Sequence, residues 1–342
     1  MRDLLLKLCR REDLTRDEAR EAFVQIMNGE ATEAQLGGLL IGLAAKGTTV
    51  DELVGAATVM REKAVPIDAG FDEADAVVLD TCGTGGSKLR ATGLFNISTT
   101  AAIIAAAAGV RVVKHGNRSA SSRSGSADVL EKLGVNLERT PDQLSHCLRQ
   151  ANICFAFARS HHPAMKHVGP ARASLGVPTI FNMIGPLANP AKAKHQLLGV
   201  FAPELTDRFA QVLRELGSTR AWVVHAEDGL DELSTLGPTR IAELHDGHIR
   251  SWTLNPADHG VPFGRLSDLQ VGSVEESAIA IREILDGQPG PKRDIALLNA
   301  GASLVVAGIA KDIRMGMSLA AEAIDTGRAK NTLELLVRYS QG

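Results

Sequence analysis

The first 65 or so residues combine apolar positions at helical spacing with polar residues that start helices. Thr15, Thr32 and Thr49 are each followed three residues later by Glu or Gln, which is the pattern of a capping box. After Thr15, apolar residues recur every three or four positions as far as Asn28-Gly29, a typical helix end. The pattern has no strand signal between these segments and predicts a small bundle of three amphipathic helices.

Beyond Pro66 the pattern changes to short apolar runs that alternate with helical segments. Four runs predict strands, at 76–79, 111–113, 154–158 and 221–225. The predicted helices lie at 98–108, 128–133, 206–216, 275–285, 294–306 and 315–323, and the last three complete the chain. Two further runs, joined by Asp246-Gly247, indicate an antiparallel hairpin near the edge of the sheet, at 241–244 and 249–253.

Strands that alternate with helices are typical of a largely parallel sheet with helices on both faces. The sequence therefore predicts an α/β fold in two parts. A small helical N-terminal domain occupies residues 1–70, and a large α/β domain with a mainly parallel central sheet occupies residues 71–342. We expect the apolar stripes of the helical domain to meet another surface as well, either the rest of the chain or a second subunit.

Composition excludes several classes of function without naming one. Lys and Arg number 37 against 40 Asp and Glu, so the net charge of −3 provides no field that attracts nucleic acid or an anionic membrane. Aromatic residues make up 4%, which argues against a surface for stacking bases. The most apolar segment, at 101–113, is too short to span a membrane. Charges interrupt the apolar N-terminus and no cysteines are spaced C-x-x-C, so we expect a reduced, soluble, cytoplasmic protein.

A glycine-rich turn, Asp80-Thr-Cys-Gly-Thr-Gly-Gly-Ser87, follows the first predicted strand. Glycine permits positive φ and lets successive N–H groups approach an anion closely. The helix that starts at Asn96-Ile-Ser98-Thr99 adds the positive end of its dipole. Taken alone, this segment would equally suit a tight structural turn.

A second polar loop, residues 114–126, follows the second predicted strand and contains Lys114, Arg118 and several serines and glycines. Loops that follow neighbouring parallel strands leave the same edge of the sheet, where ligands of open α/β sheets bind. Cations, hydroxyls and bare backbone on that edge suit a ligand rich in phosphate.

An acidic loop, Asp228-Gly-Leu-Asp231-Glu232, follows the strand that ends at His225, on the same edge. Adjacent carboxylates are hard oxygen ligands that suit Mg²⁺, although such a triplet is usually only a solvated turn. Opposite two phosphate-binding loops, a magnesium site is the better interpretation. No His or Cys cluster has zinc spacing, so the sequence suggests no transition-metal site.

Together these motifs resemble the anthranilate phosphoribosyltransferases of tryptophan biosynthesis, within the fold group of nucleoside phosphorylases and phosphoribosyltransferases. The resemblance covers nearly the whole chain and rests on Gly83-Thr-Gly-Gly86, Asn96-Ile-Ser-Thr99, Lys114-His-Gly-Asn-Arg118, Gly176-Val-Pro-Thr179 and Asp228-Gly-Leu-Asp-Glu232. It implies transfer of the phosphoribosyl group of 5-phosphoribosyl diphosphate (PRPP) to the amine of anthranilate, with release of diphosphate. It also implies Mg²⁺ as cofactor and a homodimer joined through the helical domain.

The resemblance assigns binding roles to individual residues and leaves no residue as a certain catalytic group. It implies PRPP contacts from Gly83, Gly86, Ser87, Asn96, Ser98, Thr99, Lys114, His115, Gly116, Asn117, Arg118, Ser121, Ser122 and Ser126. It implies anthranilate contacts from Gly83, Asn117, His162 and Arg172, with His115 also lining the anthranilate channel. The implied Mg²⁺ ligands are Ser98, Asp231 and Glu232.

The chain departs from the family's pattern directly after Gly86. The family usually has Asp at the position of Ser87, and the span from there to Asn96 is a few residues longer here than usual. Loss of that carboxylate would weaken a contact to Mg–diphosphate or ribose, and Lys88 or Arg90 would be placed to contact the diphosphate instead. Because the other motif positions are filled, we expect a rearranged but competent loop.

Two other functions stay open from the sequence. A pyrimidine nucleoside phosphorylase shares the fold and a related glycine loop, but it uses inorganic phosphate and would not need the motifs at 114–118 and 228–232. The second is a relative without catalysis that binds nucleic acid through the basic residues Lys88, Arg90, Lys114, Arg118 and Arg123. The net charge and the scarcity of aromatic residues oppose it.

Overall fold

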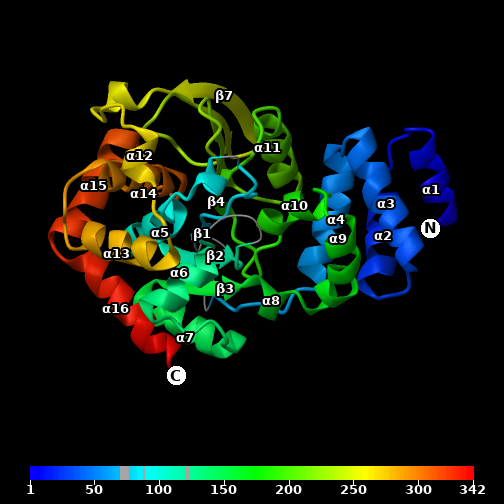
Figure 1. Ribbon diagram of the computed structural model, residues 1–342, viewed down its shortest axis with the longest axis horizontal. Helices are drawn as coiled ribbons and strands as arrows, with labels where there is room; N and C mark the ends of the chain where they lie inside the picture. Colours follow the sequence, from blue (N-terminus) through cyan, green and yellow to red (C-terminus); the bar gives the residue numbers. More distant parts are fainter. Residues whose placement is uncertain (70–76, 88, 120–123) are drawn as a thin grey trace.

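The computed structural model describes residues 1–69, 77–87, 89–119 and 124–342 and is built around one twisted sheet (Figure 1). Seven strands form this sheet in the order β3-β2-β1-β4-β5-β6-β7. Neighbours from β3 to β5 pair in parallel, whereas β6 and β7 are antiparallel. The strands are β1 (Val78–Asp80), β2 (Arg111–Gly116), β3 (Ile153–Phe157), β4 (His195–Gly199), β5 (Arg220–Ala226), β6 (Thr239–His245) and β7 (His248–Leu254).

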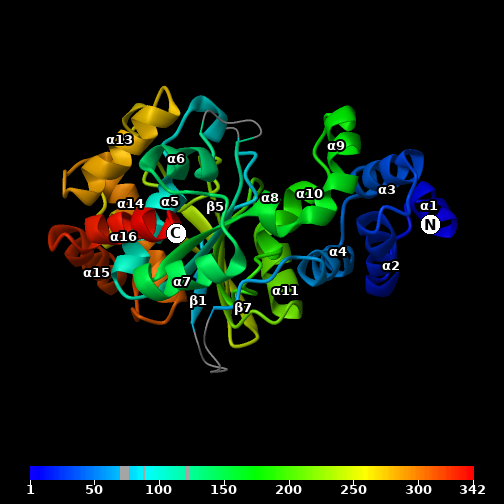
Figure 2. The ribbon, with the colours of Figure 1, turned by 90° about the horizontal axis from the view of Figure 1, so that it is seen from below.

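Helices cover both faces of the sheet, and a helical bundle lies at one end of the molecule (Figures 1 and 2). The bundle contains α1 (Arg2–Cys9), α2 (Arg16–Met27), α3 (Glu33–Lys46) and α4 (Val50–Glu62). One face carries α5 (Ile97–Ala107), α6 (Ser126–Leu133), α7 (Pro141–Ala151), α13 (Val274–Leu285), α14 (Pro291–Val306), α15 (Ile313–Asp325) and α16 (Arg328–Ser340). The other face carries α11 (Leu205–Glu215), while α10 (Phe181–Ile184) packs on α4 and α9 (Gly169–Leu175) packs on α3 of the bundle (Figure 2).

Short elements connect these layers. They are η1 (Arg90–Thr92), α8 (Ala158–His161), η2 (Pro163–His167), η3 (Gly185–Leu187), η4 (Pro256–His259) and α12 (Leu266–Leu269). None of the helices in the described part of the chain is long and apolar enough to cross a membrane.

The predicted fold class is confirmed, including all three capping boxes. The hydroxyls of Thr15, Thr32 and Thr49 each accept a hydrogen bond from the backbone N–H three residues on, and the Glu or Gln there closes the box. The predicted bundle of three helices was short by one, because α1 precedes the first box. Asp246 and Gly247 both have positive φ, as the predicted hairpin turn requires.

Several predictions for the α/β part were incomplete. Helix α7 was not foreseen, although a capping box of Thr140 and Gln143 starts it. Strand β4 was not foreseen, although it occupies the centre of the sheet between β1 and β5. The helix ending near residue 323 does not complete the chain either, since α16 follows it and packs on the sheet's apolar layer through Leu333 and Leu336. The first predicted strand begins in residues 70–76, so only its part from Val78 falls within the described residues.

The helical bundle shares its core with one face of the sheet. Buried side chains from α2, α3 and α4 continue through α10 into α11 and β5, as Phe23, Phe181, Phe209 and Val223 illustrate. The rings of Phe23 and Phe181 lie 5.6 Å apart. Segment 158–187 thus packs with the bundle although it lies within the predicted second domain. The predicted boundary between residues 70 and 71 lies outside the described residues and stays a prediction.

Candidate functional site

The glycine-rich turn is held against the end of β4. The backbone N–H of Thr84 donates to the carbonyl of Gly199 at 2.8 Å. A Cβ at Gly83 would lie 3.1 Å from that same oxygen and 3.5 Å from Asp231 Oδ2, so only glycine leaves this space open. Gly85 and Gly86 have φ of 64° and 81°, which fits the conformational freedom expected of the turn. The turn therefore presents bare backbone directly opposite the acidic loop.

Lys114 lies beneath this turn as a buried cation, with only 2% of its surface exposed. Its Nζ donates to the carbonyl of Thr81 at 2.9 Å and to the hydroxyl of Ser98 at 3.4 Å. Thr99, the next residue along α5, is buried, and its Oγ1 has no hydrogen-bond partner among the described residues. The predicted PRPP contacts from β2 and from the start of α5 are thus brought together below one turn.

The side-chain amide of Asn96 forms hydrogen bonds with other residues of the protein. It is 5% exposed, and its Oδ1 accepts hydrogen bonds from the hydroxyls of Ser124 and Ser277, each at 2.7 Å. Its Nδ2 donates to the carbonyl of Ser124 at 3.3 Å. Asn96 therefore fastens the end of the second polar loop to α13, and its predicted contact with PRPP stays a prediction.

The second polar loop folds back tightly on itself. A Cβ at Gly116 would lie 2.2 Å from Ser126 Oγ, and Ser126 Oγ donates to the carbonyl of Asn117 at 3.4 Å. These contacts bring together three of the residues predicted to bind PRPP. The predicted residues Ser121 and Ser122 lie outside the described residues, as does Lys88, and the side chain of Arg90 is not described.

Arg118 is paired with helix α6. Its guanidinium donates to Asp128 at 3.0 Å and to both carboxylate oxygens of Glu131 at 2.8 and 2.9 Å. Hydrogen bonds from Glu131 and then Asp128 raise the pKa of Arg118, so the cation stays charged. Arg118 also lies above the ring of Phe157, 5.9 Å from its centroid. The predicted PRPP contact of this side chain would require it to leave these acidic partners.

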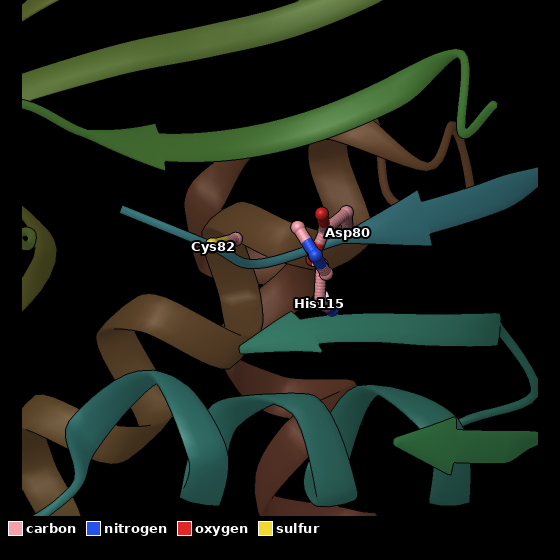
Figure 3. Close-up of side chains that lie close together, drawn as sticks. All are labelled: Asp80, Cys82 and His115. Carbon is pink, nitrogen blue, oxygen red and sulfur yellow. Dashed lines mark hydrogen bonds between the residues drawn. The ribbon is translucent and has the colours of Figure 1, made fainter. Parts of the chain in front are cut away.

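A group that the sequence did not reveal joins β1 to β2 (Figure 3). Asp80, Cys82 and His115 have potential metal-ligand atoms that all lie within 4.8 Å of one another. Asp80 is fully buried, and its carboxylate accepts hydrogen bonds from the His115 backbone N–H at 3.1 Å and from Asn189 at 2.8 Å. Burial raises the pKa of Asp80 to about 6. Because both carboxylate oxygens of Asp80 already accept hydrogen bonds, we interpret Asp80 as a structural residue and not as a metal ligand. It joins the start of the glycine-rich turn to the start of the second polar loop.

His115 contacts the second predicted histidine. Its Nε2 lies 3.2 Å from Nε2 of His162, and both side chains are buried. Burial, and next the neighbouring His162, lower the pKa of His115 to about 3. Burial, and next His161, lower the pKa of His162 to about 4. Both imidazoles are therefore neutral at pH 7, which suits the lining of a site for an aromatic ligand better than a charged pair.

Two other predicted anthranilate residues, Arg172 and Asn117, lie in different parts of the fold. Arg172 is half-buried on α9, where its guanidinium lies 5.5 Å from the ring centroid of Phe181. Burial lowers the pKa of Arg172. Asn117 is exposed after β2, and its Oδ1 accepts a hydrogen bond from the backbone N–H of Arg118 at 2.8 Å. Within the described part of the chain, no hydrogen bond joins Arg172 to Asn117.

The acidic loop is braced from several sides. Asp231 and Glu232 are 2% and 6% exposed. A Cβ at Gly199 would lie 1.7 Å from the Asp231 carbonyl oxygen, so the end of β4 packs directly on the loop. Asn299 of α14 accepts from the backbone N–H of Leu233 at 3.0 Å and donates to its carbonyl at 2.8 Å. Asp231, whose carboxylate lies against Gly83, and the buried Glu232 next to it in the chain are oxygen donors of the kind that fits a hard cation such as Mg²⁺.

The basic residues at 114 and 118 do not form an exposed cationic face. Lys114 is buried, and Arg118 is neutralised by two carboxylates. The described part of the basic set therefore gives no support to nucleic-acid binding. Lys88 and Arg123 of that set lie outside the described residues.

Both parts of the chain match families of known proteins, and individual relatives match nearly its whole length. Residues 75–330 match the family described as "Glycosyl transferase family, a/b domain", and residues 2–64 match its helical bundle domain. The anthranilate phosphoribosyltransferase of Parvibaculum lavamentivorans is 51% identical over 99% of this chain and 97% of its own length. That of Rhodopseudomonas palustris CGA009 is 48% identical over 99% of this chain and 98% of its own length.

Solved structures match as well. The crystal structure of anthranilate phosphoribosyltransferase from Thermus thermophilus has a TM-score of 0.92 and 42% identity, and the match covers 99% of this chain and 100% of that one. The enzyme from Saccharomyces cerevisiae, solved with PRPP and Mg, has a TM-score of 0.89 over 99% of this chain and 97% of its own. At 24% identity, this second structure shows likeness of fold alone.

Proposed function

Because the chain belongs to the anthranilate phosphoribosyltransferase family, we propose that it transfers the phosphoribosyl group of PRPP to the amine of anthranilate. The products are N-(5-phosphoribosyl)anthranilate and diphosphate, in a step of tryptophan biosynthesis. One observation carries this proposal beyond likeness: Gly83 of the glycine turn, Lys114 of strand β2 and Asp231 of the acidic loop meet at one edge of the sheet. A phosphate-rich ligand with a metal ion requires such a combination of bare backbone, cation and carboxylate.

The reaction separates charge, and the site is built to stabilise it. Breaking the bond between C1 and diphosphate develops negative charge on the leaving group and positive charge on the ribose. The N–H groups of the glycine turn and the Nζ of Lys114 would stabilise the diphosphate, at roughly 3–4 kcal/mol for each well-placed donor. Mg²⁺ held by Asp231, Glu232 and Ser98 would neutralise further charge on the diphosphate.

The attacking amine of anthranilate is a neutral nucleophile, so its position matters more than its activation. We propose that Arg172 and Asn117 orient anthranilate and that the neutral pair His115–His162 lines its site, as the family resemblance implies. The guanidinium of Arg172 is able to donate two parallel hydrogen bonds to the carboxylate. No strong general base is needed, which agrees with the low pKa values of both histidines.

We also propose that two subunits pair through the helical bundle, in a reducing cytoplasm. Leu6 of α1 and Ile41 of α3 are large apolar side chains that are 46% and 40% exposed, which supports a partner on this surface. Cys9 is an exposed free thiol, which suits a reducing compartment.

One assay tests the proposed activity: loss of anthranilate fluorescence after addition of PRPP, with and without Mg²⁺. We expect turnover that depends on both. Asp231→Asn should lower kcat/KM by on the order of 100-fold, because it removes one charged ligand from the diphosphate site. Asp258→Asn, an exposed carboxylate in η4, is the matched control and should leave turnover unchanged. Absence of turnover under every condition would refute the proposed function.

A further inference from the structure

Ser87, where the chain departs from its family's usual Asp, makes a contact that a carboxylate cannot make. The side chain is 3% exposed, and its hydroxyl donates a hydrogen bond to the carbonyl of Gly229 at 2.7 Å. Gly229 belongs to the acidic loop, 142 residues further along the chain. An ionised Asp has no proton to donate and would instead face the carbonyl with negative charge.

Gly229 is a fixed point of the acidic loop. Its φ of 92° favours glycine, and its backbone N–H donates to the carbonyl of Ala226 at 2.9 Å. Next to it, Asp228 Oδ1 accepts from the backbone N–H of Leu230 at 2.8 Å. Asp231 and Glu232 follow Gly229 by two and three residues, so the hydrogen bond from Ser87 reaches the backbone directly before these two carboxylates.

The glycine turn and the acidic loop are joined at a second place, through β4. Thr84 donates to the carbonyl of Gly199, and Gly199 packs on the backbone of Asp231. The contact through β4 fixes the turn at its first glycines, and the contact through Ser87 fixes it at its last position. Between these two contacts lie Gly85 and Gly86, the residues with positive φ.

We propose that Ser87 is a positioning residue, which sets the place of Asp231 and Glu232 relative to the glycine turn through Gly229 instead of contacting PRPP itself. This inference rests on the proposed function for its consequence in binding, since the two loops are those expected to hold Mg²⁺ and PRPP. It also gives the departure from the family pattern a role: in a turn of altered length, the hydroxyl ties the turn to the acidic loop.

Three variants separate this role from direct contact. Ser87→Ala removes the hydroxyl, Ser87→Thr keeps it, and Ser87→Asp restores the residue usual in the family. Ser145→Ala is the matched control, because Ser145 is 4% exposed and its hydroxyl donates to backbone carbonyls, those of Asp68 and of Pro141 in α7, that belong to neither loop. Amide hydrogen exchange of the segment 227–236, without ligand, reports the coupling directly, and calorimetric titration with PRPP at a series of Mg²⁺ concentrations reports its consequence.

We expect Ser87→Ala to speed exchange in segment 227–236 several-fold and to weaken Mg²⁺-dependent PRPP binding by about three- to tenfold, as loss of one hydrogen bond of about 1 kcal/mol allows. Ser87→Asp should weaken binding more than Ser87→Ala, and Ser87→Thr should retain both properties. Unchanged exchange in Ser87→Ala, or tighter PRPP binding in Ser87→Asp, would overturn the inference. Failure of the wild-type protein to turn over anthranilate would instead refute the proposed function, while the exchange measurements would still decide the coupling.

Discussion

Two single residues, His115 and His162, make stability depend on pH. In the folded protein their pKa values are about 3 and about 4, whereas an exposed imidazole has a pKa of 6.5. As pH falls below 6.5 the unfolded chain binds protons that the folded chain refuses, so stability is lost from pH 6.5 downward. Between pH 7.5 and pH 4.5, we expect the free energy of unfolding of His162→Gln to fall by about 2 kcal/mol less than that of the wild type, as measured by urea unfolding.

Asp80 changes the pH dependence of stability in the direction opposite to the two histidines, so only a comparison of His162→Gln with the wild type isolates the histidine contribution. Its raised pKa of about 6 means that its contribution to stability declines as pH rises from 3.8 to 6. The total pH dependence is therefore smaller than the histidines alone would give. His248→Gln, at an exposed position of β7, is the control and should unfold with the wild-type pH dependence. An equal acid sensitivity in His162→Gln and wild type would show that the buried pair is not its source.

At this scale the sequence predicted which residue types gather, and it could not predict their partners. Lys114, Ser98 and Gly83 lie at the sheet edge where their loops were expected to meet. The bonds from Asn96 to Ser277 and from Ser87 to Gly229 join residues more than a hundred positions apart. Such bonds depend on how loops close in three dimensions, which no local pattern encodes.

Helix α6 binds the side chain of Arg118 through two carboxylates and so would compete with PRPP for this cation. Asp128 and Glu131, one turn apart on this helix, hold the guanidinium that the family resemblance assigns to PRPP. Because Arg118 and Glu131 are both exposed, their ion pair contributes only about 0.2–1 kcal/mol, and a phosphate is able to compete with it. We expect Glu131→Gln to lower the KM for PRPP by about two- to fivefold with little change in kcat, as measured by steady-state kinetics.

Glu275→Gln is the matched control for this prediction. Glu275 of α13 forms an ion pair at 2.7 Å with Lys132, which lies on α6 next to Glu131. The variant therefore removes an exposed ion pair from α6 without touching Arg118. An unchanged KM in Glu131→Gln would mean that Arg118 stays on α6 when PRPP binds.

Local start signals account for only part of what was predicted among the elements. Helix α7 begins with a capping box of Thr140 and Gln143 and was nevertheless missed, whereas α11 has no side-chain cap and was predicted from its apolar spacing. The helices after Thr15, Thr32 and Thr49 begin with capping boxes that three or four residues specify. Helix α16 begins after Gly327 with no side-chain cap, and it escaped prediction. Strand β4 has the sequence His-Gln-Leu-Leu-Gly, so its apolar run is only two residues long, whereas the equally buried β3 and β5 contain longer apolar runs that were predicted.

The missing strand also limited what could be predicted of the whole molecule. Because β4 lies between β1 and β5, its last residue, Gly199, brings Gly83 and Asp231 together. The sequence predicted that both loops leave the same edge of the sheet, but not that they touch across a third strand. Strand order is a property of the assembled sheet, and the contacts of the site follow from it.

The apolar surface of the helical bundle leads to a prediction for the whole assembly. Helix α1 packs on α3 where Gly38 and Gly42 let Leu5 and Leu8 approach, while Leu6 of α1 and Ile41 of α3 remain exposed. A second bundle would bury both side chains, at about 2 kcal/mol for each. We expect a dimer at micromolar concentration in sedimentation velocity, and we expect Leu6→Glu combined with Ile41→Glu to yield monomers.

The control for the dimer is Ile279→Glu, because Ile279 is 55% exposed on α13, on the far side of the sheet from the bundle (Figure 1). This variant should sediment as the wild type does, since charge at an unrelated apolar position leaves the bundle surface intact. A wild-type monomer, or a dimer that the Ile279 variant breaks and the bundle variant does not, would place the contact elsewhere. Among the described residues, Gly83 lies against Gly199 and Asp231 of its own subunit, so we expect the monomeric bundle variant to keep its turnover.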